Sequence, residues 1–151
     1  MSNAIKKSEN YIRNIILNSK GKFKASMLRG TDFAGADLTG SLFEASDARE
    51  ANFDNAYLTD CTFSVTDLAD AGFRKSILMR TIFSTLGLDG AKFIDVKFAD
   101  AKLTMIDLRK TVFENCTFHG VDFKYCDLRG QCLDGLTFIG VKFDRQRFVF
   151  L

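Results

Sequence analysis

The stretch TDFAGADLTGSLFEAS, residues 31–46, places a bulky apolar side chain at every fifth position, at Phe33, Leu38 and Phe43. Neither regular secondary structure explains this spacing, because the buried face of a helix repeats about every 3.6 residues and that of a strand every 2. Some other regular structure, with a period of five, must set the pattern.

The same period runs through almost the whole chain of 151 residues. From Phe23 to Phe148 there are 26 positions spaced five apart, and each of them is Phe or Leu except Ala48. No charged residue falls on these positions or two residues before them. Side chains two apart in an extended segment point the same way. Both positions of each five-residue unit are therefore predicted to point inward.

The polar residues indicate a corner after each short segment. Eight of the eleven glycines lie two residues after the apolar position, where they permit a tight turn. Asp recurs just before the apolar position, where its carboxylate can accept nearby backbone N–H groups. Four corners close a square of twenty residues. We therefore predict an all-β solenoid, a quadrilateral β-helix of about 6.5 coils, over residues 21–151.

The units ADLTG, ANFDN, AYLTD and AKFID resemble the A(D/N)LXX motif of the pentapeptide-repeat family, and the resemblance extends over residues 21–150 without an insertion. It implies a right-handed quadrilateral β-helix, an intracellular or effector context and no enzymatic activity. The best-understood members of that family protect DNA gyrase from quinolones as acidic, dimeric DNA mimics. Others are secreted bacterial effectors or regulators of cell differentiation.

Residues 1–20 are predicted to form a helix that caps the first coil. Ile5, Ile12, Ile15 and Ile16 give this segment an apolar face, and Gly21 is a helix stop signal. An open coil end needs such a cover because its strand edges are unpaired. A membrane-surface helix, favoured by the basic residues of the segment, and a helix that docks on a partner are the alternatives.

The other end of the solenoid suggests self-association. Four apolar residues lie in or near the last coil, namely Phe143, Phe148, Phe150 and Leu151. We hypothesise that two copies form a homodimer through this C-terminal coil, as the gyrase-protecting relatives do. Gln131 and Gln146 fall at inward positions, so their amides need partners and the final coils are expected to be looser or wetter.

One outward surface is unusually apolar. With a coil of twenty residues, Tyr57 stacks on Ile77, Met79 follows, and Leu42 and Ile82 lie around the adjacent corner. Outward Ile can reflect strand preference alone. The alternative interpretation is a docking surface for a protein partner.

The charges are banded along the predicted rod. Residues 31–70 carry a net charge of −8 and residues 71–110 carry +4, although the chain as a whole is only +2. DNA carries about one charge per 1.7 Å, so a mimic needs negative charge along its length, which the basic band interrupts. The register also predicts stacked opposites, such as Asp60–Arg80 and Lys75–Asp95, and like-charged stacks, such as Asp47 over Asp67.

No residue pattern predicts catalysis, a cofactor or a metal. Cys61, Cys116 and Cys126 fall at inward positions, while Cys132 and the single histidine, His119, point outward. No apolar run is long enough to span a membrane. We therefore expect a non-enzymatic protein-interaction rod with an unknown protein partner. It should be cytoplasmic unless it is a secreted effector, and should contact neither nucleic acid nor membrane. A DNA mimic acting on gyrase is the alternative function.

Overall fold

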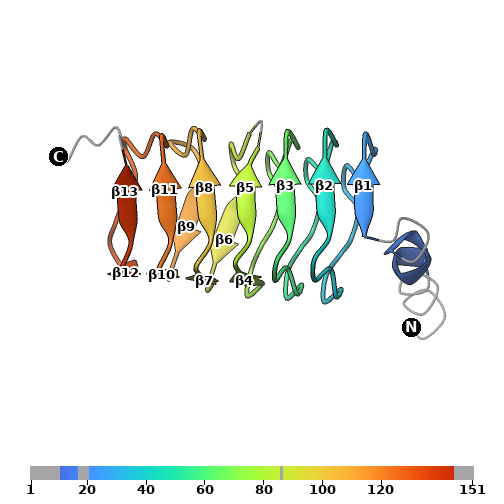
Figure 1. Cartoon of the computed structure of the whole chain (residues 1–151), viewed down its shortest axis with the longest axis horizontal. Helices are drawn as coiled ribbons and strands as arrows, with labels where there is room; N and C mark the ends of the chain where they lie inside the picture. Colours follow the sequence, from blue (N-terminus) through green and yellow to red (C-terminus); the bar gives the residue numbers. More distant parts are fainter. Residues whose placement is uncertain (1–10, 17–20, 86, 145–151) are drawn as a thin grey trace.

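The computed structural model describes residues 11–16, 21–85 and 87–144. Coils stack along the long axis of a rod, with a short helical segment beyond its first coil (Figure 1). The strands, in chain order, are β1 (Lys22–Lys24), β2 (Leu42–Glu44), β3 (Thr62–Ser64), β4 (Ile77–Met79), β5 (Ile82–Ser84), β6 (Lys92–Ile94), β7 (Lys97–Ala99), β8 (Lys102–Thr104), β9 (Val112–Glu114), β10 (Thr117–His119), β11 (Asp122–Lys124), β12 (Thr137–Ile139) and β13 (Lys142–Asp144).

The strands form parallel sheets on the sides of a square tube. In the orientation of Figure 1, β1, β2, β3, β5, β8, β11 and β13 make the front face, and β4, β7, β10 and β12 make the lower face. Strands β6 and β9 lie on the rear face, and isolated parallel bridges such as Asp47↔Asp67 make the upper face. Every paired residue is twenty positions from its partner, as in Phe23↔Phe43 and Phe43↔Phe63. The predicted right-handed quadrilateral β-helix and its twenty-residue coil are confirmed.

The corners have the left-handed backbone that the glycine positions predict. All eight of those glycines have φ between 59° and 76°. The same conformation also occurs at residues for which it is unfavourable, including the β-branched Val65 at φ 49°. Backbone hydrogen bonds between coils therefore impose the corner even where the side chain opposes it.

The core consists of stacked aromatic columns. Phe23, Phe43, Phe63 and Phe83 on the front face stack with ring centroids 4.6, 4.7 and 5.1 Å apart. A second column, which starts at Phe33 on the rear face, meets the first edge to face across the tube, with centroids 5.7–6.2 Å apart. Both arrangements are favourable for aromatic pairs, which explains why this chain uses Phe on opposite sides.

Several inward polar side chains donate hydrogen bonds to backbone carbonyls of the preceding coil. Cys61 Sγ donates to the carbonyl of Leu38 at 2.8 Å, and Thr81 Oγ1 donates to that of Leu58 at 2.9 Å. The Gln131 amide obeys the same rule, since Nε2 donates to the carbonyls of Leu108 and, at 2.8 Å, Thr111. The partners that the half-buried amide of Gln131 requires are thus supplied by the protein itself.

Residues 11–16 are helical and cover the first coil. Ile12, Ile15 and Ile16 are partly buried and pack against the hydrophobic core, while the backbone N–H of Gly21 bonds to the carbonyl of Ile16 at 3.3 Å. Ile5 lies outside the described residues. Within those residues, no helix has the length and apolarity needed to cross a membrane.

Candidate interaction surfaces

The described residues contain no metal site. No three His, Cys, Asp or Glu side chains come together there in a way that could hold an ion. His119 is exposed at the end of β10. Cys61 is buried, and burial raises the pKa of its thiol to about 12, so it is a poor nucleophile at neutral pH. Cys132 is the exposed thiol, as the sequence predicts.

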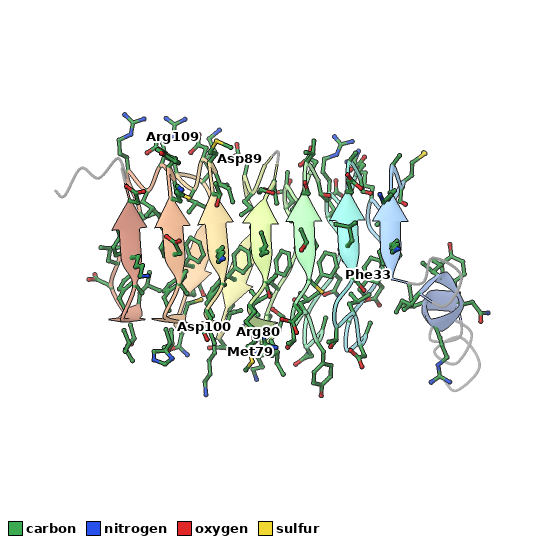
Figure 2. All side chains as sticks on the ribbon, in the orientation of Figure 1. Phe33, Met79, Arg80, Asp89, Asp100 and Arg109 are labelled. Atoms are coloured by element: carbon green, nitrogen blue, oxygen red, sulfur yellow. The ribbon has the colours of Figure 1, made fainter. Side chains whose placement is uncertain are left out.

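Three residues of the predicted apolar surface come together on the lower face, and we call them the apolar patch: Tyr57, Ile77 and Met79. Tyr57 and Ile77 are bridged neighbours on successive coils, with 50% and 42% of their surfaces exposed. Met79, at the end of β4, is 39% exposed and projects from the lower side of the rod (Figure 2).

The other two predicted residues lie on the front face. Ile82, in β5, is 37% exposed and lies around the corner from Met79. Leu42 is half-buried and two coils away from Ile82, because Thr62 pairs between them. The structure therefore gathers the patch and Ile82 around one corner but leaves Leu42 apart.

Charged residues flank the apolar patch along the rod. One outward column of the lower face reads Asp37, Tyr57, Ile77 and Lys97 over four successive coils. The Asp37 carboxylate accepts the backbone N–H of Thr39 at 3.1 Å, and hydrogen bonds from Thr39 hold the pKa of Asp37 below its usual value. Lys97 is exposed and has no ion pair within the described residues.

The upper face carries arginine–aspartate pairs within single five-residue units, which the predicted stacks of residues twenty apart did not include. Arg49 forms a bidentate pair with Asp47, at 2.8 and 2.6 Å, and its Nε is 3.8 Å from Asp67. The Arg49 hydrogen bond lowers the pKa of Asp47 to about 2. Arg109 forms the same clamp with Asp107 and lies 3.6 Å from Asp127. The Asp47–Asp67 and Asp107–Asp127 stacks are therefore each bridged by an arginine.

The sequence signal for these clamps is local. Asp and Arg two residues apart in one unit point to the same side, because extended side chains alternate. Of the predicted stacks of opposite charge, Asp60 and Arg80 form a bidentate pair at 2.6 and 2.8 Å. Lys75 and Asp95 form no ion pair in the described chain, and Asp95 accepts instead from Asn115 Nδ2 at 2.7 Å.

The last described coil ends in an apolar cavity of about 250 Å³. Phe138 and Phe143 line it with 37% and 42% of their surfaces exposed, in contrast to the buried Phe118 and Phe123 one coil earlier. Three other residues of the predicted dimer contact, Phe148, Phe150 and Leu151, lie outside the described residues.

Comparison with known families agrees with this geometry. A model described as pentapeptide repeat region matches residues 56–133, more than half of the chain, and one for pentapeptide repeats matches eight copies over residues 26–64. The chain belongs to the pentapeptide-repeat family. None of the curated proteins has a matching sequence.

Several solved structures are similar to this pentapeptide-repeat protein. QnrB1, described as a plasmid-mediated fluoroquinolone resistance protein, is 22% identical over 82% of this chain and 83% of its own in a trypsin-treated form, with a TM-score of 0.37. A pentapeptide-repeat protein of the Arabidopsis thaliana thylakoid lumen is 26% identical over 77% and 71%, with a TM-score of 0.38. The family assignment rests on the two family models.

Proposed function

We propose that this pentapeptide-repeat protein is a non-enzymatic rod that binds another protein through the apolar patch. The observation that carries the proposal is the exposure of Tyr57, Ile77 and Met79 side by side on a rigid wall. Aromatic residues and Met are enriched at protein interfaces. Their backbone is held by hydrogen bonds to both neighbouring coils, so binding would lose little conformational entropy.

The test compares two substitutions in one outward column of the lower face. Ile77→Asp should remove partners that crosslink to the purified wild-type protein, since it places a charge in the patch. Thr117→Asp adds the same charge two coils away, beyond Lys97, and should leave those partners bound. Circular dichroism must show that both variants keep the fold. Equal crosslinking of the wild type and the Ile77→Asp variant would refute the role of the patch.

A DNA mimic that acts on gyrase is the second candidate, favoured by the −8 charge of residues 31–70. Part of that charge is compensated by basic residues outside the band, because Lys24 lies 2.9 Å from Glu44 and Arg80 lies 2.6 Å from Asp60. A supercoiling assay with and without a quinolone, at two salt concentrations, decides the point. Protection that weakens with salt would support mimicry, and its absence would leave the interaction rod.

The C-terminal coil is the proposed homodimer contact, supported by the apolar cavity and the exposed Phe143. Light scattering at micromolar concentration should give a dimer mass for the wild type and a monomer mass for Phe143→Asp. A monomeric wild type would refute this contact. We place the protein in the cytoplasm, with free cysteines, and retain a secreted effector as the alternative.

A further inference from the structure

The lower face is self-complementary along the rod. Its first outward column carries a negative charge, two apolar side chains and a positive charge in order, from Asp37 through Tyr57 and Ile77 to Lys97. Its second outward column, Thr39, Thr59, Met79 and Ala99, has no charge. If a second copy faces this column with its rod axis reversed, its basic end lies opposite the acidic end and its apolar centre lies opposite the apolar centre.

We propose that the apolar patch binds a second copy of this chain, in an antiparallel side-by-side pair whose two-fold axis passes between the coils of Tyr57 and Ile77. In a two-fold contact, residue i of one copy meets residue j of the other and the reverse. When the two-fold axis is parallel to the strands of the lower face, each outward column lies opposite the same column of the second copy. Tyr57 then faces Ile77 of the second copy, and Asp37 faces Lys97 at both ends. This inference rests on the proposed function and specifies its partner.

The edges of the lower face obey the same symmetry. At the front corner Asp60 would face Arg80 of the second copy. Within each copy, Asp60 and Arg80 already form an ion pair at 2.6 Å. At the rear corner Asn55 would face Lys75. Within coils one to four, no like charges oppose each other on the face or at its corners.

The rear face continues the pattern around the corner. Asp32 lies in the first coil and Lys92 in the fourth, on one column through Asn52 and Gly72. The alternative with the rods parallel would place Asp37 opposite Thr39 and Lys97 opposite Ala99, which uses neither charge. Charge complementarity therefore selects the antiparallel pair.

The contact is small, so the association should be weak. Four coils about 4.8 Å apart, each about 16 Å wide, give a flat area of about 300 Å², against the about 800 Å² per partner of stable complexes. Self-association should therefore require high protein concentration and should weaken as salt is raised, because the charges surround a modest apolar centre.

The experiment exchanges the charges, in a Phe143→Asp background that removes the C-terminal contact. Asp37→Lys leaves Lys opposite Lys97 in both contacts of a pair, and Lys97→Asp leaves Asp opposite Asp37. Each variant alone should self-associate about tenfold more weakly than the background protein in sedimentation velocity at low salt. An equimolar mixture of the two restores both attractions and should form heterodimers with at least the affinity of the background pair.

Lys102→Asp is the matched control, since it reverses an exposed lysine on the front face and should leave association unchanged. Failure of the mixture to associate, or a background protein that stays monomeric at about 1 mM, would overturn the proposal. Those results would leave the proposed function intact if Ile77→Asp still removes a different crosslinked protein. If Ile77→Asp reduces neither self-association nor crosslinking, both the antiparallel pair and the proposed function are refuted.

Discussion

Two buried threonines in one turn of the solenoid should respond in opposite ways to the same substitution. Thr81 Oγ1 donates to the carbonyl of Leu58 at 2.9 Å, whereas Thr85 Oγ1 is buried and has no hydrogen-bond partner among the described residues. Thr→Val replaces the hydroxyl by a methyl group of similar size. We predict that Thr85→Val raises the free energy of unfolding and Thr81→Val lowers it.

The magnitude follows from what the two sites share. Thr81 is fully buried and Thr85 is 9% exposed, so the added methyl group contributes nearly the same apolar burial at both. That contribution cancels in the difference between the variants. What remains is the hydrogen bond lost at Thr81, worth about 0.5–1.5 kcal/mol, and the unpaired buried hydroxyl removed at Thr85, whose burial costs about 1–3 kcal/mol. The Leu58 carbonyl keeps the backbone N–H of Cys61 at 3.1 Å, so no larger loss is expected.

Urea unfolding followed by circular dichroism measures the difference, provided that the slope with denaturant is unchanged. Thr111→Val is the internal control, because Thr111 Oγ1 donates to the Leu88 carbonyl at 3.0 Å and should behave like Thr81. If Thr85→Val destabilises the protein as much as the two bonded sites do, the hydroxyl at Thr85 has a partner and the reasoning fails.

Phe63→Ala should lower the free energy of unfolding in urea by about 4 kcal/mol, because the ring is fully buried between two stacked rings. Phe143→Ala should lower it by less than half as much, because Phe143 is partly exposed, unless a second copy covers the ring. A thiol reagent at neutral pH should label Cys132 quickly and the three buried cysteines only on unfolding; fast labelling of more than one thiol would contradict this. Because Arg49 holds the pKa of Asp47 at about 2, below its usual 3.8, the pair stabilises the fold above that usual value and this stabilisation disappears as pH falls toward 2. Thermal melts of Arg49→Gln should thus lose less stability on acidification than those of the wild type.

The sequence predicts the fold almost completely because two of every five residues are bound by one rule. The inward positions admit only uncharged side chains, so the period of Phe23, Leu28 and Phe33 is visible without any structure. The surface is less predictable, because long charged side chains choose among several partners. Arg49 could have paired along the rod, yet it bonds chiefly to Asp47 in its own unit. The five-residue period likewise does not predict that the Thr85 hydroxyl is buried without a hydrogen-bond partner among the described residues, because this depends on the local backbone geometry.

In such a fold, the outward columns carry the information about function. The inward positions are almost uniform from Phe23 to Leu128, so they distinguish this chain little from any other solenoid of its kind. Residues twenty apart are neighbours, and a column read along the rod therefore describes a continuous strip of surface. The column from Asp37 to Lys97 has an acidic residue at one end, a basic residue at the other and two apolar residues between them, so it is complementary to its own reverse. A strand-preference origin for Ile77 explains one apolar residue, but not the opposite charges one coil beyond each end of the Tyr57–Ile77 pair.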